Sequence, residues 1–413
     1  MVKMGQFHSY ANSFQAVARL ELVSIKKMLE LLGHPEEGLR FLHVAGTNGK
    51  GSVCAFLQSI LTEAGYRCGK YISPNLVSVC ERISVDGEEI SQKEMEELLS
   101  KMEDAARKTE EAIGSYPTQF EIWTAAAFCY FKEKQCDYVV LETGLGGTRD
   151  ATNAIPKSAA DIITRIAMDH MGYLGNTLSE IAEAKAGIIK NTLVTLEQEP
   201  EAMEVLERVC REKGHKMLVT GNVLVHEPVG MCECIDYAGM ERLLLGIPGY
   251  HQIENAALAI ETARLLRVDE PAIRAGLAKA KNPGRLERLS ENLIFDGAHN
   301  PNGMESLLFS LNRYFPTKPV QFIMACMGDK DIKKELLQIR KAYPDTTIYT
   351  LTVQDNPRAM PAEQLAEKAR SCGLRAEACK DFFEVQKKSH SGLTVVCGSL
   401  YLYRDLKLQE SEL

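Results

Sequence analysis

The segment from residue 43 to residue 52 reads His-Val-Ala-Gly-Thr-Asn-Gly-Lys-Gly-Ser and contains the strongest chemical signal in the chain. Three glycines and a lysine stand between a short apolar run and a segment with helical spacing, which predicts a turn from a strand into a helix. Backbone N–H groups in such a turn attract phosphate, and the Lys50 ammonium neutralises its charge. We therefore predict a nucleotide phosphate site. The residues expected to form it are Thr47, Asn48, Gly49, Lys50, Gly51 and Ser52.

This segment differs at two places from the usual nucleotide-binding pattern G-x-x-x-x-G-K-[ST]. Val44 occupies the position of the first glycine, and Gly51 occupies the hydroxyl position, with Ser52 one residue later. Taken alone, the segment is also compatible with a tight turn that carries an incidental lysine. Its place between a strand and a helix favours nucleotide binding.

Two further reactive side chains follow predicted strands. Glu142 ends an apolar run and precedes a glycine-rich stretch at 144–147, and His170 follows the run at 161–167, next to Asp169. Residues just past the carboxyl ends of parallel strands line the ligand crevice of an open α/β sheet. A carboxylate and an imidazole near a phosphate loop are candidate magnesium ligands. Imidazole is an unusual magnesium ligand, so a hydrogen-bonding role is an equal alternative for His170.

The elements that must position these residues alternate along the chain. The predicted strands are Arg40–Ala45, Asp137–Leu141 and Asp161–Ala167, and the predicted helices are Ser52–Ala64, 92–111 and 255–267. Strands that alternate with helices of this length indicate a mostly parallel sheet with helices on both faces.

A cluster of helix-breaking residues at 281–284 predicts a domain boundary. The alternation then resumes, with apolar runs at Leu293–Phe295, Val320–Cys326, Thr347–Leu351 and Leu393–Cys397. We therefore predict an α/β protein of two domains. Residues 1–281 form a large P-loop ATPase-like domain with a mostly parallel sheet, and residues 284–413 form a smaller, Rossmann-like α/β domain.

The composition excludes several classes of protein. The chain has 413 residues, 45% of them apolar, and 48 basic against 56 acidic residues give a formal net charge of −8. A mildly acidic chain without a long basic run is a poor binder of nucleic acid or anionic membranes. It has no apolar stretch of about 18 residues that would span a bilayer, and its N-terminus lacks a secretory signal core. The twelve cysteines lack paired zinc-ligand spacing, so we expect reduced thiols and a cytoplasmic location.

Short segments along nearly the whole chain resemble the folylpolyglutamate synthase/dihydrofolate synthase family of the Mur ligase superfamily. In order they are HVAGTNGKGS (43–52), SPNL (73–76), ERI (81–83), TQFE (118–121), LETGLGGTRDATN (141–153), MDHMGYLGNTLSEIAEAKAGIIK (168–190), PGYHQIENAALAI (248–260), PGRLE (283–287), FDGAHNPNG (295–303), GDKD (328–331) and GSLY (398–401). The resemblance implies an ATP-dependent ligase that adds L-glutamate to dihydropteroate, to the polyglutamate tail of folate, or to both. An acyl phosphate is the implied intermediate, and ADP and phosphate are the implied products.

The resemblance also implies a role for individual residues. The implied catalytic residues are Lys50, His170 and Lys185. The implied Mg²⁺ ligands are Ser73, Glu142, His170 and Lys185, the last as an N6-carboxylated (carbamylated) lysine; from the sequence alone Lys185 is an exposed helix lysine. The implied ATP contacts outside the phosphate loop are Asn255, Arg285 and Asp296, with His299 in a supporting role. The implied pterin-binding residues are Thr118, Gln119, Phe120, Glu121, Arg149, Asp150 and Ala151.

The implied partners are small molecules only, without nucleic acid or membrane, for a monomeric enzyme that uses ATP, Mg²⁺ and, as an option, a monovalent cation. Thr148-Arg149 stands where the family usually has Arg and then a hydrophobic residue. Three alternatives remain open: a synthase that only extends tails, a peptidoglycan-precursor ligase, and an ATP-binding switch that ligates nothing. The phosphate loop lies too early in the chain for the additional N-terminal domain of a peptidoglycan-precursor ligase.

Overall fold

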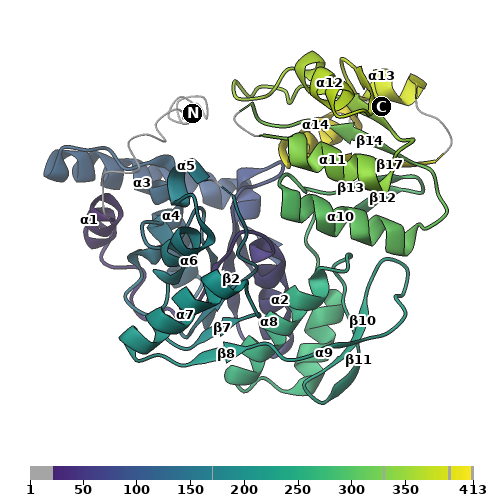
Figure 1. The fold of residues 1–413 in the computed structure, drawn as a ribbon. Coiled ribbons are helices and arrows are strands. Elements are labelled where there is room, and N and C mark those ends of the chain that lie inside the picture. Colours follow the sequence, from purple (N-terminus) through teal and green to yellow (C-terminus); the bar gives the residue numbers. More distant parts are fainter. Residues whose placement is uncertain (1–21, 170, 329–330, 389–391, 411–413) are drawn as a thin grey trace. The chain divides into compact units, whose positions relative to one another are not determined.

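The computed structural model describes residues 22–169, 171–328, 331–388 and 392–410 (Figure 1). The chain forms two compact units by its internal contacts. Among the described residues, the larger unit contains those from 22 to 224 together with 236–243 and 254–280, and the smaller unit contains 225–235, 244–253 and those from 281 to 410. The ranges 1–281 and 284–413 stay predictions of the functional domains.

Within the described residues, the larger unit is built on an eight-stranded sheet in the order β4-β3-β2-β5-β1-β6-β7-β8. These strands are β1 (Phe41–Ala45), β2 (Cys68–Tyr71), β3 (Ile83–Val85), β4 (Glu88–Glu89), β5 (Tyr138–Glu142), β6 (Ala160–Ile163), β7 (Leu193–Thr195) and β8 (Met217–Val219). From β2 to β8 all neighbouring strands are parallel, and only the edge strands β3 and β4 pair antiparallel. The predicted α/β fold with a mostly parallel sheet is confirmed.

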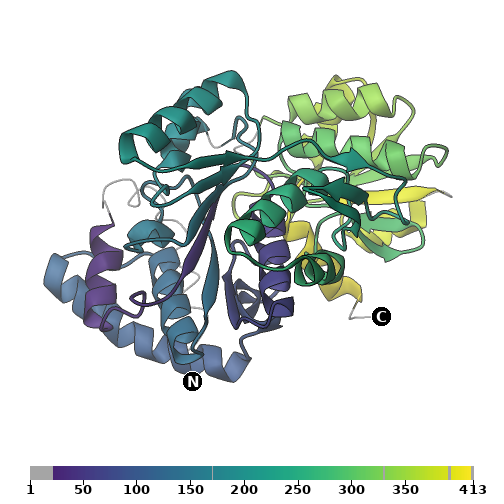
Figure 2. The same cartoon turned by 90° about the horizontal axis from the view of Figure 1, so that it is seen from below.

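Helices cover both faces of this sheet, as Figure 2 shows. They are α1 (Val23–Leu31), α2 (Lys50–Glu63), α3 (Gln92–Ile113), α4 (Gln119–Glu133), α5 (Met171–Leu174), α6 (Leu178–Ala186), α7 (Pro200–Lys213), α9 (Glu270–Lys279) and most of α8 (Gln252–Leu265), with short 3₁₀ turns at Val79–Arg82 and Ala151–Ala154. Every residue of β1 and β5 is buried, as expected for central strands covered on both sides.

Strand β6 is shorter than the run Asp161–Ala167 that the sequence predicts, because it ends at Ile163. The residues after it leave the ladder and bond to the glycine-rich loop after β1. The Thr47 N–H donates to the Arg165 carbonyl (2.9 Å), and the Ala167 N–H donates to Thr47 Oγ1 (3.1 Å). The apolar character of this run therefore reflects burial beside a loop as well as strand pairing.

The part of the chain that the structure describes also contains a six-stranded sheet in the order β12-β13-β17-β14-β15-β16, which belongs to the smaller unit. Its strands are β12 (Glu287–Ser290), β13 (Leu293–Phe295), β14 (Val320–Met324), β15 (Thr347–Thr350), β16 (Arg375–Ala378) and β17 (Leu393–Cys397), and its helices are α10 (Pro301–Tyr314), α11 (Lys333–Ala342), α12 (Ala362–Ser371), α13 (Phe382–Lys388) and α14 (Tyr401–Glu410). Only β12 pairs antiparallel, so the smaller α/β unit is confirmed.

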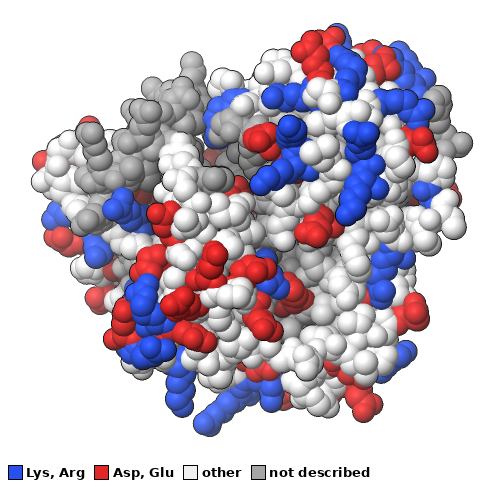
Figure 3. All heavy atoms as spheres, in the orientation of Figure 1, with Lys and Arg blue, Asp and Glu red and all other residues white. Residues whose placement is uncertain are grey.

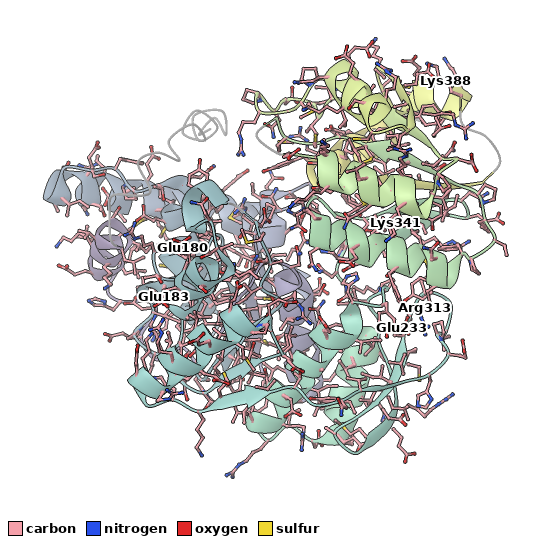
Figure 4. All side chains as sticks on the ribbon, in the orientation of Figure 1. Glu180, Glu183, Glu233, Arg313, Lys341 and Lys388 are labelled. Carbon is pink, nitrogen blue, oxygen red and sulfur yellow. The ribbon has the colours of Figure 1, made fainter. Side chains whose placement is uncertain are left out.

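A buried ion pair attaches residues 225–235 to the smaller unit. Glu233 is fully buried and accepts hydrogen bonds from Arg313 Nε (2.8 Å) and Nη2 (3.0 Å) and from the Tyr314 hydroxyl (2.5 Å), both on α10 (Figure 4). A buried carboxylate is stable only when paired and hydrogen-bonded in this way. The same segment contributes to a small sheet in the order β11-β10-β9, formed by Met240–Leu244, Cys234–Tyr237 and Leu224–Val225.

All twelve cysteines lie within the described residues and are free thiols, as predicted. Across the described ranges, no helix combines the length and the apolar character needed to cross a membrane.

Helix α9 packs closely on α2, the helix that begins at the predicted phosphate loop. A Cβ atom added at Gly276 would lie 2.4 Å from Ile60 Cα and 2.6 Å from Ile60 N, both backbone atoms of α2. We therefore expect Gly276→Ala to lower the free energy of unfolding by about 3 kcal/mol, because the helices must separate. Urea unfolding measures the loss. Gly221→Ala is the control, since nothing lies within 4 Å of its added Cβ, and should change stability by less than about 0.5 kcal/mol.

Candidate active site

The predicted phosphate loop and the predicted metal ligands lie at one edge of the larger sheet. Strands β2, β5, β1 and β6 are adjacent and parallel, so their carboxyl ends meet at the same edge. Ser73 follows β2, Glu142 ends β5, the loop at 46–49 follows β1, and Thr164 follows β6. This edge is the place where open α/β sheets bind their ligands.

Two glycines of the loop occupy positions that no other residue would fill. Gly46 has φ 153° and Gly49 has φ 91°. A Cβ atom would lie 1.8 Å from Thr164 Oγ1 at Gly46 and 2.2 Å from Asn255 Oδ1 at Gly49. The requirement for glycine is therefore both conformational and steric. The second contact also places the buried Asn255 of α8, a predicted ATP residue, directly against the phosphate loop.

The residues after β6 hold the loop in place. Thr164 Oγ1 donates to the Asn48 carbonyl (2.6 Å), and Thr47 Oγ1 donates to the Ala167 carbonyl (3.0 Å). The prediction from the sequence missed Thr164 as a loop anchor. The signal available was its position directly past a strand end, next to the strand that carries the loop.

Two lysines converge on one carbonyl of the loop. Lys50 Nζ donates to the Gly46 carbonyl (3.2 Å) and to the Thr47 carbonyl (3.4 Å), and Lys185 Nζ donates to the same Gly46 carbonyl (2.8 Å). Two ammonium groups at one acceptor repel each other, so the neutral form of one of them is favoured. Burial, together with the nearby charge of Lys50, lowers the pKa of Lys185 to about 7.

The interpretation of Lys185 as an exposed helix lysine, made from the sequence alone, is wrong. Its side chain is 3% exposed. The reason is the close packing of the last turn of α6 against the glycine-rich stretch after β5: a Cβ at Gly147 would lie 2.9 Å from the Lys185 carbonyl oxygen, and the Thr148 N–H donates to the Ala184 carbonyl (2.8 Å). An ion pair joins Glu183 of α6 to Arg208 of α7. Figure 4 labels Glu183 on α6, and in the same orientation Figure 3 shows acidic and basic side chains side by side over α6 and α7.

Glu142 and Ser73 are in contact beside the loop. Glu142 is 5% exposed, and its Oε2 accepts the Ser73 N–H (3.2 Å). Magnesium commonly takes one or two carboxylates, substrate phosphates and waters, so one acid and one hydroxyl beside a phosphate loop fit this ion. Among the described residues, no group of three His, Cys, Asp or Glu side chains forms a metal site by itself. His170 lies outside the described residues, so its role stays a prediction.

The segment at 118–121 begins α4 with a capping box. Glu121 Oε2 accepts the Thr118 N–H (2.7 Å), Thr118 Oγ1 accepts the Glu121 N–H (3.2 Å), and Glu121 Oε1 accepts the Ile25 N–H (3.1 Å). Both oxygens of this nearly buried carboxylate therefore bond to backbone, one at the helix start and one at α1. Gln119, the first residue of α4, is half-buried.

Phe120 and the turn after β5 lie side by side. The half-buried Phe120 ring touches Gly144, where a Cβ atom would lie 2.6 Å from ring Cζ. Arg149 in the turn is exposed, whereas Asp150 and Ala151 are buried. Asp150 accepts the N–H groups of Leu145 (2.8 Å) and Thr152 (3.0 Å). The structure thus brings the two predicted pterin-binding segments together.

In the smaller unit, Arg285, Asp296 and His299 surround one turn. The Asp296 carboxylate is buried and accepts the N–H groups of Leu286 and Ala298 (both 2.8 Å). His299 Nδ1 donates to the Gly297 carbonyl (2.8 Å). Arg285 lies against the same glycine, since a Cβ at Gly297 would be 2.3 Å from Arg285 Nη1. The structure therefore groups these three predicted ATP contacts.

Comparison with known proteins adds independent findings. The model of the Mur ligase middle domain matches residues 44–263, and the model of the Mur ligase glutamate ligase domain matches residues 284–399. The Bacillus subtilis protein named dihydrofolate synthase/folylpolyglutamate synthase is 35% identical over 409 residues, which covers 93% of each chain.

Solved structures show the same similarity. Escherichia coli FolC in complex with DHPP and ADP is 30% identical, with a TM-score of 0.86 over 99% of this chain and 97% of that one. Mycobacterium tuberculosis folylpolyglutamate synthase complexed with ADP and AMPPCP is 27% identical, with a TM-score of 0.85 over 98% of both chains. The architecture described above is thus that of proteins whose structures were solved in complex with ADP.

Proposed function

The chain belongs to the Mur ligase family, among its dihydrofolate and folylpolyglutamate synthases, and we propose that it adds L-glutamate both to dihydropteroate and to the tail of reduced folates. It is an ATP-dependent acid–amino-acid ligase, as the sequence resemblance predicts. The observation that supports the proposed site best is the convergence of Lys50, Lys185 and Glu142 around the loop at 46–52. A synthase that only extends tails is the second candidate.

The reaction must activate a carboxylate, which is a poor acylating agent because oxide would be its leaving group. A carboxylate oxygen attacks the γ-phosphorus, the bond to ADP breaks, and an acyl phosphate forms. The glutamate amine then attacks the carbonyl carbon, loses a proton, and phosphate leaves. Such phosphoryl transfer depends on alignment and cancellation of charge. The loop amides and Lys50 bind the phosphates, and Asn255 positions the loop at Gly49.

The acidic side of the site would hold magnesium. Glu142 and Ser73 would bind this ion, which supplies positive charge next to the phosphates when it is bound. Lys185 is suited to carbamylation because burial and the nearby Lys50 charge lower its pKa to about 7, so about half of its amine is neutral near pH 7. The neutral amine attacks the carbon of carbon dioxide, releases a proton to solvent and becomes an anionic carbamate. This conversion replaces the repulsion between Lys185 and Lys50 by attraction. The carbamate would also offer an oxygen ligand to the metal ion, beside the predicted ligand His170.

The pterin would bind between the segments 118–121 and 149–151. The half-buried Phe120 supplies a flat apolar face. Asp150 already accepts hydrogen bonds from the Leu145 and Thr152 N–H groups and from the Thr152 hydroxyl, so it would serve pterin binding chiefly by holding the turn beside that ring. The exposed Arg149 is placed to attract an anionic glutamate tail.

The domain at 284–413 would contribute the remaining ATP contacts and the glutamate site. Arg285 would stabilise phosphate charge, while Asp296 and His299 shape the turn beside it. We further propose a cytoplasmic monomer that takes only small-molecule substrates, with a monovalent cation as an optional additional ion.

Phosphate release by the purified chain tests the function. With ATP and Mg²⁺ present, release should depend on glutamate together with either dihydropteroate or tetrahydrofolate. Glutamate-dependent release with tetrahydrofolate but not with dihydropteroate would indicate a synthase that only extends tails. Release that is indifferent to both folate substrates and glutamate would indicate an ATP-binding switch and contradict the proposal.

A further inference from the structure

A buried chain of polar side chains connects β1 to the pterin-binding turn, and the chemistry above does not use its first two members. His43, on β1, has no exposed surface. Its Nε2 lies 2.9 Å from Thr152 Oγ1, and Thr152 Oγ1 lies 2.5 Å from Asp150 Oδ1. Thr152 is also fully buried. A polar chain inside a sheet domain is stable only when its members satisfy one another.

The direction of these hydrogen bonds follows from the number of protons. Both Asp150 oxygens accept backbone N–H groups, as an ionised carboxylate does, so the single Thr152 hydroxyl proton points to Asp150. Thr152 must then accept from His43, which assigns the imidazole proton to Nε2. The opposite tautomer would bury an N–H at Nδ1, an atom with no hydrogen-bond partner among the described residues. Burial holds the pKa of His43 well below its usual range, so the ring is neutral.

The carboxylate at the end of this chain holds the turn in shape. Asp150 Oδ2 accepts the Leu145 N–H (2.8 Å), while the Asp150 N–H donates to the Gly147 carbonyl (3.1 Å). The start of the turn, at Gly144, touches the Phe120 ring. The orientation of Asp150 therefore determines where the turn lies against that ring.

We propose that His43 and Thr152 are positioning residues for pterin recognition: they orient the Asp150 carboxylate, which holds the turn at 144–150 against Phe120. This inference rests on the proposed function. If it holds, the affinity for the pterin substrate depends on the buried His43, although His43 does not contact the pterin itself.

Steady-state kinetics with dihydropteroate test the inference. Thr152→Val keeps the shape and removes the hydroxyl, and His43→Leu removes the donor. Each should raise the KM for dihydropteroate about ten-fold, while the KM values for ATP and glutamate stay within about two-fold. Thr152→Ser keeps the hydroxyl, and His43→Gln places an amide N–H near the position of Nε2, so both should stay close to the wild type. In the double variant that combines Thr152→Val with His43→Leu, the KM for dihydropteroate should not exceed that of the more strongly affected single variant, because both residues act through one chain of hydrogen bonds.

Thr346→Val is the matched control, because it removes a buried hydroxyl of the smaller unit that donates to the Val320 carbonyl (2.6 Å). It should leave the KM for dihydropteroate unchanged even where its melting temperature falls. Equal rises of all three KM values in Thr152→Val would indicate a general loss of structure and overturn the inference, as would no rise at all.

Two further measurements keep the result decisive. If both apolar variants fail to fold, His43→Asn replaces them, since its shorter amide does not reach Thr152: a raised KM for dihydropteroate supports the inference, and an unchanged one overturns it. Wild-type protein without glutamate-dependent ligation contradicts the proposed function itself. Active wild-type protein with unresponsive variants contradicts only the roles of His43 and Thr152.

Discussion

Lys50→Ala is expected to lower the glutamate-dependent release of phosphate about 10³-fold, with the fold unchanged. The ammonium group is held beside the phosphate loop by the carbonyls of Gly46 and Thr47. It is the loop's own cation, and transfer of a phosphoryl group depends chiefly on such charge. The loss should appear in kcat, because negative charge shifts as the bond to ADP breaks. The fold should be unchanged because both hydrogen bonds of the half-buried Lys50 side chain go to carbonyls of its own loop, and water can replace them in the variant.

The control for this variant is Lys93→Ala on α3, which removes a lysine that is 86% exposed in the same unit. Its kcat should remain within about two-fold of the wild type. Circular dichroism and the melting temperature establish that both variants are folded. A kcat near the wild-type value in folded Lys50→Ala protein would contradict the assignment of the loop at 46–52 to the phosphates.

The conformation of the loop at 46–49 was predictable because its requirements are local. A positive φ at Gly46 and Gly49 needs glycine, and a lysine at the start of a helix after a buried strand is visible in the printed residues. The alternation of apolar runs with helices likewise predicted β1, β5, β13 and β17 closely. Each of these features depends on residues within a few positions of one another.

The burial of Lys185 could not be predicted in the same way. It depends on contacts between the last turn of α6 and Gly147, which lie almost forty positions apart in the sequence. The membership of residues 225–235 in the smaller unit has a similar cause. The partner of Glu233 is Arg313, 80 residues later, and no local pattern relates them.

Carboxylates at turns and at helix starts pose a more general ambiguity. Glu121, Asp150 and Asp296 were all predicted to contact a ligand, and in the structure each accepts two or more backbone N–H groups. A ligand site and a sharp turn both need an acceptor at such a position, so the residue type alone does not separate the two roles. Only the hydrogen-bond partners do, and they make these three residues part of the scaffold as well as candidate contacts.

Lys185→Ala is expected to reduce kcat to a similar extent as Lys50→Ala, by about 10²- to 10³-fold. The amine lies 2.8 Å from the Gly46 carbonyl and close to Lys50, so its unmodified ammonium form would be repelled by the Lys50 ammonium. As a carbamate, Lys185 would instead bring an oxygen ligand to the metal side of the site. Added bicarbonate should not restore the alanine variant, because no amine remains to react.

A small carboxylate should restore part of the activity of Lys185→Ala, since the substitution leaves a buried space and formate or acetate carries the missing anionic oxygens. Lys190→Ala is the matched control. It also removes a lysine whose pKa is lowered, to about 8, but this half-buried lysine donates to the Asn153 carbonyl and lies outside the predicted metal ligands. Carboxylates should not rescue it. The carbamate itself should give a ¹³C NMR signal in wild-type protein supplied with labelled bicarbonate and none in Lys185→Ala. Full activity of wild-type protein in buffer freed of carbon dioxide, with no such signal, would contradict the carbamate. The unmodified Lys185 amine would then act as a hydrogen-bond donor to the Gly46 carbonyl of the loop.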